Sequence, residues 1–495
     1  MFDPGWRCVY TPDIALQGFK VSGLDWGLQI PTEIVTCSSL SCLPLYLESH
    51  LSKQAESIPG GSGSLSDTLG RAYERVTGEE DARVCKDIPE AACRHQPRNF
   101  IGYLVANALS KIADELSSAR LILPWLMSSL GAPVVLVGFL VPIREAGVLI
   151  PQLWVAAKVR SRALRKPVWM LGAALSSLAL LGIAAAAYLS QGLVAGLWIL
   201  LALSLYSLAR GLCSVSAKDV LGKTVSKNRR GTVMGYSGSI AGLAMFGLGI
   251  AMVVQPRLSE QLGLLIGLLL LAAVFWWLSI SAFAAIVEVP GSTEGGGNGW
   301  TVAWQQLDIL RTDATFRYFV LTRAALLSVA LMPPFYVVLF EQAQGGLVSL
   351  GMLIIISGLA TTLSSPVWGY FSDRSSQWVM ALAASGAGAS GLLLAASQHV
   401  LDETANLMVT GMAYGVIMVC HGGVRLGRKA YLVNMATVET RARYVAVSNT
   451  VIGGVMLLGG LVGIAGDVWS PLAVIMALSV LGFTAALMSA RLPPV

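Results

Sequence analysis

The sequence predicts an all-α protein embedded in a membrane, with twelve transmembrane helices in two pseudo-symmetric halves of six. Composition, the length of the apolar runs and an internal repeat lead to this prediction. Of the 495 residues, 55% are hydrophobic and only 13% are charged, and the mean hydropathy is +0.67. Soluble domains carry about 25% charged residues. The balance is therefore typical of a chain that lies mostly in lipid.

The apolar runs begin near residue 98 and follow one another with short polar breaks. Each is long enough to cross a bilayer as a helix, which takes about 20 residues. The runs do not alternate between apolar and polar residues, so helices are favoured over the strands of a barrel. The predicted spans are 99–127, 131–157, 168–189, 193–216, 232–254, 262–287, 318–340, 346–368, 378–398, 405–426, 443–465 and 470–491.

Four segments organise the chain. Residues 1–97 form an N-terminal extension to which we assign no role, 98–287 a first six-helix half, 288–317 a linker and 318–491 a second half. The linker is expected because it contains the flexible sequence GSTEGGGNGW followed by an amphipathic stretch. The cysteines have no metal-ligand spacing, and we expect them to be reduced.

Loop charge predicts the orientation, because positive residues in short loops stay in the cytoplasm. Lys and Arg fill the loops near 158–166, 218–230 and 425–443, whereas the loops between these carry mostly Asp and Glu. We therefore expect a multi-pass protein of the plasma (inner) membrane with both termini and the linker in the cytoplasm. The basic loop residues behind the net charge of +6 then set the orientation of the helices in the membrane. The lipid bilayer is the expected partner, nucleic acid is not, and we expect a monomer.

An internal repeat supports the division into halves. Sliding the sequence by 211 positions aligns KDVLGKTVSKNRRG, which begins at Lys218, with KAYLVNMATVETRA, which begins at Lys429. The same offset places Arg230 over Arg441. The two segments follow the fourth and tenth predicted spans, so equivalent helices precede equivalent loops.

A polar motif, GYFSDR, ends the eighth predicted span and supplies Gly369, Asp373 and Arg374. Nearly the same offset places Asp373 over Ser161 and Arg374 over Arg162. The second half therefore carries the acid of this motif, and the first half carries only its base.

Twelve helices in two repeated halves, a long central linker and a G-x-x-x-D-R signature after an even-numbered helix resemble the major facilitator superfamily over about residues 98–491. The resemblance implies a transporter whose two halves rock around a central site. It also implies a conformational latch in which Asp373 faces the start of the fifth span. The expected latch residues are Gly369, Asp373, Arg374, Arg162, Arg230 and Arg441.

Charged residues inside the first two spans are candidates for a central site, because a charge in hydrocarbon costs about 2.5–3.5 kcal/mol. Lys111, Asp114 and Glu115 lie at a depth similar to that of Arg144 and Glu145. One interpretation is a closed network that pairs Lys111 with Glu115 and Arg144 with Asp114. The other is a site that binds protons or a charged substrate. The resemblance, in which spans 1, 4, 7 and 10 line the cavity, favours Asp114 and Glu115 for coupling.

Further candidates lie in spans 4, 7 and 10. Arg210, Arg323 and Arg425 either extend to the membrane surface or face the cavity, where they would favour an anionic substrate. His421 is a candidate cavity or packing residue. Pro333-Pro334 interrupts the seventh span and predicts a bend that a gate could use.

Motifs of soluble enzymes fail on their context. GAGASG at 386–391 lies inside an apolar span, LGKT at 221–224 lacks the first glycine of a phosphate loop, and CHGG at 420–423 supplies no serine nucleophile. We therefore expect no enzyme activity, no catalytic residue, no metal site and no cofactor.

The expected function is secondary active transport of a small solute by alternating access, coupled to protons as a symporter or an antiporter. The fifth span is rich in glycine but lacks the Gly-Pro pair common in antiporters of the resembled family, so drug export is not favoured over uptake. The alternative is a non-transporting membrane sensor or scaffold that uses residues 1–97 to bind a partner. Substrate identity and direction stay open.

Overall fold

The computed structural model describes residues 68–71, 73–74, 93–149, 159, 161–254, 261–291, 293, 307–343, 346–437 and 440–495. These residues form helices and no strand, which confirms the all-α class. Ten of the described helices are long and apolar enough to cross a membrane, and they correspond to predicted spans 3 to 12. Most of the N-terminal extension and linker residues 294–306 lie outside the described residues.

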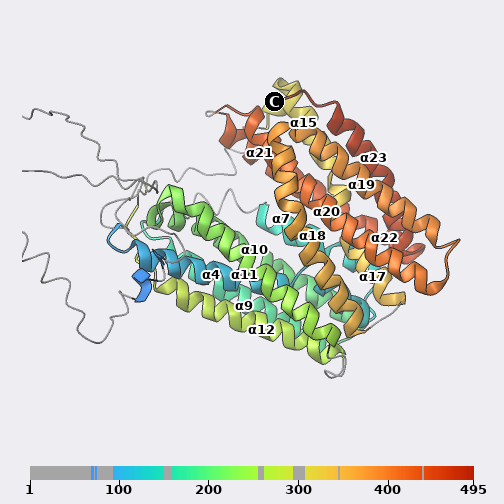
Figure 1. Cartoon of the computed structure of the whole chain (residues 1–495), viewed down its shortest axis with the longest axis horizontal. Coiled ribbons are helices and arrows are strands. Elements are labelled where there is room, and N and C mark those ends of the chain that lie inside the picture. The colour runs from blue at the N-terminus through green and yellow to red at the C-terminus, as the bar shows by residue number, and fades with distance from the viewer. Residues whose placement is uncertain are drawn as a thin grey trace, which may run out of the picture. The chain divides into compact units, whose positions relative to one another are not determined.

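The first half is built from eight described helices, five of which are grouped together in Figure 1 as α4, α9, α10, α11 and α12. Their bounds are α4 Gln96–Leu116, α5 Ile122–Ser129, α6 Val134–Gly138, α7 Leu140–Leu149, α9 Lys166–Leu189, α10 Gly192–Thr224, α11 Lys227–Val254 and α12 Gln261–Ala284.

The second half follows the linker and forms the other group of helices in Figure 1. Its elements are α14 Ile309–Thr312, α15 Ala314–Ala325, α16 Leu327–Leu331, α17 Pro333–Ala343, α18 Leu347–Arg374, α19 Ser376–Ser397, α20 Glu403–Met435, α21 Arg441–Gly459, the short 3-10 helix η1 Gly460–Val462, α22 Gly463–Val468 and α23 Pro471–Ala490.

The repeat read from the sequence is confirmed by the helix bounds. α10 and α20 each contain 33 residues, and both the first and the last residue of α20 lie 211 positions after those of α10. The two helices extend well past the predicted ends at 216 and 426. Their final turns therefore belong to the helices rather than to loops.

Within the predicted spans 99–127 and 131–157 the helix is divided, and a proline lies just after each division. A proline ring clashes with the carbonyl four residues earlier and supplies no N–H. Pro124 excludes a continuous helix through Arg120, and α4 ends at Leu116 before α5 begins. Pro142 acts in the same way on Gly138, the last residue of α6. Residues 150–158 of the second span lie outside the described residues.

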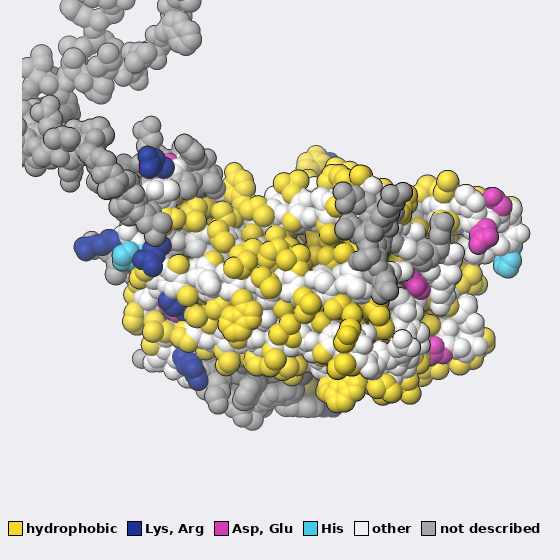
Figure 2. Space-filling view, turned by 90° about the horizontal axis from the view of Figure 1, so that it is seen from below, with side chains coloured by type: hydrophobic (Ala, Val, Ile, Leu, Met, Phe, Trp, Pro, Cys, Tyr) yellow, Lys and Arg dark blue, Asp and Glu magenta, His cyan; other side chains and the backbone are white. Residues whose placement is uncertain are grey.

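The surface of the helical bundle suits a lipid environment. Figure 2 shows a face covered largely by hydrophobic side chains, with most of the visible Lys and Arg near one end and Asp and Glu toward the other. Large apolar side chains of the bundle are strongly exposed, among them Leu178 at 58%, Leu243 at 70% and Leu363 at 69%. Apolar exposure on this scale is unfavourable in water and favourable in hydrocarbon.

The two halves pack closely at one end, which we call the closed end. In α11 and α18, a Cβ added to Gly351 would lie 2.9 Å from the carbonyl oxygen of Gly249. In the symmetry-related crossing, a Cβ added to Gly138 of α6 would lie 2.7 Å from the carbonyl oxygen of Gly460. Real Cβ atoms do not approach that closely, so only glycine permits these crossings.

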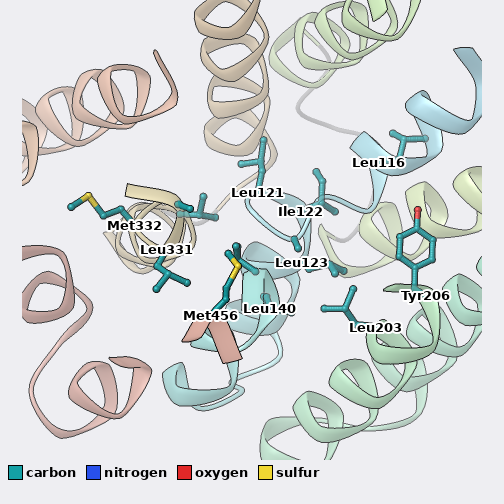
Figure 3. Packing of buried hydrophobic residues seen from close by; sticks show 14 of the residues in the cluster. Leu116, Leu121, Ile122, Leu123, Leu140, Leu203, Tyr206, Leu331, Met332 and Met456 are labelled. Carbon is teal, nitrogen blue, oxygen red and sulfur yellow. The ribbon is translucent and has the colours of Figure 1, made fainter. Parts of the chain in front are cut away.

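Polar contacts and an apolar plug complete the closed end. Asp467, the residue before the last of α22, accepts hydrogen bonds from the backbone N–H groups of Val134 at 2.6 Å and Val135 at 2.9 Å. Ser128 of α5 donates to Glu341 of α17. Figure 3 shows the plug, which buries side chains from both halves. Its labelled members at this junction are Leu121, Ile122, Leu123, Leu140, Leu331, Met332 and Met456.

A short part of the extension packs on the start of α4. Tyr73 is buried, lies edge-on to Phe100 at 5.1 Å between ring centroids, and accepts a hydrogen bond from Gln96 at 3.0 Å. Cys93 is disulfide-bonded, so the expectation of reduced cysteines is wrong for this residue. Cys213 and Cys420 are free and buried.

Candidate functional site

Asp114 is the centre of a polar cluster inside the first half. Its Oδ1 accepts hydrogen bonds from Tyr206 Oη at 2.7 Å and from Arg144 at 3.0 Å. Its Oδ2 accepts from Arg210 at 2.6 Å. The donors come from α7 and α10, so one carboxylate joins three helices. The predicted pairing of Arg144 with Asp114 is confirmed as a contact.

Aromatic rings support the two arginines of this cluster. The guanidinium of Arg210 lies 4.7 Å from the ring centroid of Trp276, and that of Arg144 lies 5.2 Å from the ring of Tyr206. Ser117 also donates to the Tyr206 hydroxyl at 3.3 Å. Both cations thus combine an ion pair with a cation–π contact, which holds them inside the bundle at reduced cost.

Lys111 and Glu115 are not paired, contrary to the closed network considered from the sequence. Lys111 Nζ donates instead to the carbonyl of Met234 on α11, at 3.0 Å. The carboxylate of Glu115 is exposed and lies within electrostatic range of Arg120 and Arg425. Glu115 is therefore an acid without a fixed ion pair.

Glu145 pairs with Arg120, a residue that we did not select from the sequence. The two are 2.5 Å apart and join α7 to the break between α4 and α5. Arg120 lies inside the first predicted span, so the cost of a charge in hydrocarbon was the signal that could have identified it.

Arg323 of α15 occupies the place in the second half that Lys111 of α4 occupies in the first, and it is only 7% exposed. It donates to Ser448 at 2.6 Å and to Asn449 at 3.0 Å, both on α21. Lys111 on α4 and Arg323 on α15 therefore make matching contacts with α11 and α21. The ligands of Arg323 are neutral, so its charge is solvated by dipoles and not by a carboxylate.

α20 places His421, Arg425 and Arg428 on one face at helical spacings of four and three. His421 is 6% exposed, and neither of its ring nitrogens has a hydrogen-bond partner. The charges of Arg425 and Arg428 act on His421 and on Glu145 of the first half. Arg428 was read as a loop charge because the predicted tenth span ended at 426.

The predicted contact of the latch is not made in this conformation. Asp373 and Arg374 are exposed, and Arg374 packs on Tyr370. Arg230 donates to the carbonyls of Val225 at 3.0 Å and Gly222 at 2.7 Å, and so caps the end of α10 instead of facing Asp373. A Cβ on Gly369 would meet nothing within 4 Å.

The other two predicted latch residues, Arg162 and Arg441, also show no latch contact among the described side chains. Arg162 is exposed, and the side chain of Arg441 lies outside what the structure describes. The neighbouring backbone N–H groups of Arg165 and Lys166 donate to Glu288, at 2.9 and 2.7 Å. Lys223 Nζ lies 3.0 Å from the same carboxylate. Sequence spacing could not indicate these contacts, because the partners of Glu288 lie at least 65 positions away in the chain.

Pro333-Pro334 breaks the seventh span as predicted. α16 ends at Leu331 and α17 begins at Pro333. Across the described residues, no group of three or more His, Cys, Asp or Glu side chains is placed to hold a metal ion.

Solved structures of transporters share this architecture. A mutant of the nucleoside transporter NupG is 14% identical with a TM-score of 0.60, and the match covers 79% of this chain and 99% of that one. The xylose transporter XylE from E. coli, in an inward open conformation, is 12% identical with a TM-score of 0.57 and coverage of 82% and 97%.

A POT family transporter in complex with a thioalcohol-conjugated peptide is 12% identical, with a TM-score of 0.60 and coverage of 81% and 97%. At these identities the likeness concerns the fold. No curated protein matches the chain. The family model described as Major Facilitator Superfamily matches residues 100–420. The chain belongs to the major facilitator superfamily.

Proposed function

We propose that this protein is a secondary active transporter that moves a small solute by alternating access. The observation that carries the proposal is the unequal packing of the two halves. α11 and α18 touch at Gly249 and Gly351. In Figure 1 the two groups of helices meet at the end where α18 begins and diverge toward the ends where α4 and α21 begin. Two bodies that touch at one end and separate at the other have the geometry that rocking requires.

The separated end is the cytoplasmic one in this proposal. Basic residues within 161–166, 223–230 and 428–429 lie there, in loops or in the helix turns next to them, as the distribution of positive charge requires. The structure then corresponds to an inward-facing state, and both termini are cytoplasmic. One of the similar structures, XylE, is also described as inward open. The proposed setting is a monomer in the plasma membrane.

Glu115 is the proposed carrier of a coupling proton. Asp114 is fixed by two arginines and a tyrosine, and Glu145 is fixed by Arg120. Glu115 has no such ion pair and is open to the cavity. A carboxylate that is free to change protonation as its surroundings change is what coupling needs. The D-xylose-proton symporter among the similar structures is a precedent within the fold.

Proline breaks at the closed end supply the proposed gate. Met332 lies between α16 and α17, and Leu121 lies just before α5, so both plug residues are at breaks. Short helices joined at Pro333-Pro334 can change direction without unpacking the long helices α18 to α20.

Flux into liposomes that contain the purified full-length protein tests this function. Nucleosides, pentoses, short peptides and small organic acids would be offered with the outside more acidic than the inside. We expect one class to accumulate, and a protonophore to abolish the accumulation. If no solute moves and none raises the melting temperature of the protein, the non-transporting sensor or scaffold replaces the transporter.

A further inference from the structure

Positive charge exceeds negative charge where the two halves face each other, and most of the excess lies on the second half. On the first half, the three acids Asp114, Glu115 and Glu145 are matched in number by Arg120, Arg144 and Arg210. Lys111 adds one further positive charge there. On the second half, Arg323, Arg425 and Arg428 approach the same region. The described acids of that half lie at or beyond helix ends; they are Asp308, Asp313, Glu341, Asp373, Asp402, Glu403 and Asp467.

Among these three arginines, Arg428 is the member that interacts with both of the others. Within the described residues, none of the three has a carboxylate within the 4.0 Å of an ion pair, and the Nε of buried Arg323 has no hydrogen-bond partner. Like charges held together in a partly buried wall destabilise the protein unless an anion binds between them.

The chemistry of the cluster selects oxyanions. A guanidinium group presents a planar fork of donors that matches a carboxylate or phosphate with two parallel hydrogen bonds. The ring nitrogens of His421, unpartnered and 6% exposed, lie within electrostatic range of Arg425 and Arg428 and can add a donor. An uncharged sugar would leave the repulsion in place, and a cation would increase it.

We infer that the transported solute is a small anion whose carboxylate or phosphate group binds between Arg323, Arg425 and Arg428. The inference rests on the proposed transport function. Glu115 faces this cluster from the first half and is near enough to Arg425 for their charges to interact. Protonation of Glu115 removes a competing negative charge, so an anion and a proton would enter the cavity together.

Ligand-dependent melting of the purified full-length protein tests the inference at fixed ionic strength. The probes are succinate, inorganic phosphate and succinamide, which is the uncharged counterpart of succinate. We expect stabilisation by at least one anion and none by succinamide. Arg425→Gln and Arg428→Gln should each weaken anion binding about tenfold, which is about 1.4 kcal/mol. Arg491→Gln, at an exposed arginine just after α23, is the matched control and should bind as the wild type does.

The melting temperature without added anion provides a second readout. Removing one of several repelling charges should leave it unchanged or raise it by roughly 2 °C. A structural role for either arginine predicts a decrease and would overturn the inference. So would equal stabilisation by succinamide, absence of stabilisation by either anion, or anion binding that both glutamine variants retain.

One competing role has its own signature. If Arg425 and Arg428 only form ion pairs with Glu115 and Glu145 in another conformation, the glutamine variants would shift the spacing of spin labels between the halves without changing anion binding. Flux is recorded separately. Liposomes that move no solute refute transport even where anions stabilise the protein, whereas flux restricted to uncharged solutes refutes only the anion site.

Discussion

Asp467 caps the first turn of α6 from the opposite half of the protein. Its two carboxylate oxygens accept from the backbone N–H groups of Val134 and Val135, at 2.6 and 2.9 Å. The contact can exist only while the closed end is closed, so it stabilises one conformation selectively.

Replacing Asp467 should therefore change the balance between conformations. Asp467→Asn removes the negative charge that strengthens both hydrogen bonds and should destabilise the closed end by about 1–3 kcal/mol. The population in which this end is open should therefore increase. Distances between spin labels on the two halves would measure the shift. Asp402→Asn, an exposed acid just before α20, serves as the control. Equal distance distributions for Asp467→Asn and the wild type would contradict the selective role.

Asp114→Asn should destabilise the first half. The substitution leaves the partly buried Arg144 and Arg210 without their shared carboxylate, and breaking such a pair costs up to about 3–5 kcal/mol. A lower melting temperature in detergent is the expected result. Tyr206→Phe removes only one hydrogen bond to the same oxygen and should cost about 1 kcal/mol. If Tyr206→Phe were the more damaging change, the ion pairs would not be the main stabilising contacts.

Glu115→Gln should abolish uptake driven by a pH gradient, because glutamine mimics the protonated acid permanently. Exchange of labelled for unlabelled solute should continue, since exchange moves no net proton. Glu403→Gln, at the exposed first residue of α20, should leave both activities intact. Uptake by Glu115→Gln that still followed the pH gradient would transfer the coupling role to another group.

Asp373→Asn should favour the conformation described here. The latch contact of Asp373 is already absent in this state, so the substitution can weaken only the state in which the halves meet at the latch end. Spin labels near Gly235 and Gly369 should report a larger fraction of long distances. Asp402→Asn, at an exposed acid just before α20, is the matched control.

Asp313 should make stability depend on acid pH. Burial alone would raise the pKa of Asp313, but hydrogen bonds from Phe316 N–H and the Tyr444 hydroxyl outweigh it and hold the pKa below its ordinary value of 3.8. Its stabilisation is therefore complete above that ordinary value and is lost as pH falls through the lower folded value. Asp313→Ala should cost about 1 kcal/mol at pH 7 and progressively less as the pH falls below 3.8, as melting curves would show. A cost independent of pH would contradict the ionised cap.

Apolar length and repetition were enough to predict most of the fold. Ten of the twelve spans follow from runs that only a helix could bury in lipid, and the 211-residue offset matches the ends of α10 and α20. The breaks near Ser117 and Phe139 were missed because hydropathy continues across them. Pro124 and Pro142 carried that information, through a clash with a carbonyl four residues earlier.

The site could be predicted in its residues but only partly in its pairs. A charge among apolar residues is visible in a sequence, and so Asp114, Glu115 and Arg210 were identified. The bond from Arg210 to Asp114 joins residues 96 positions apart, and helix rotation decides it. Whether the latch is open depends on which of two conformations has the lower free energy. A pattern of residues does not reveal that difference.

The proline breaks have a consequence for how the closed end opens. At Leu121, Phe139 and Met332 the backbone has left the continuous helical ladder, and the apolar plug covers these points. Their amide hydrogens should exchange with deuterium as soon as the plug separates, while amides in the middle of α10 or α20 stay protected. Hydrogen exchange at these three short stretches of backbone would thus report how often the gate opens, without a spin label and without knowledge of the substrate.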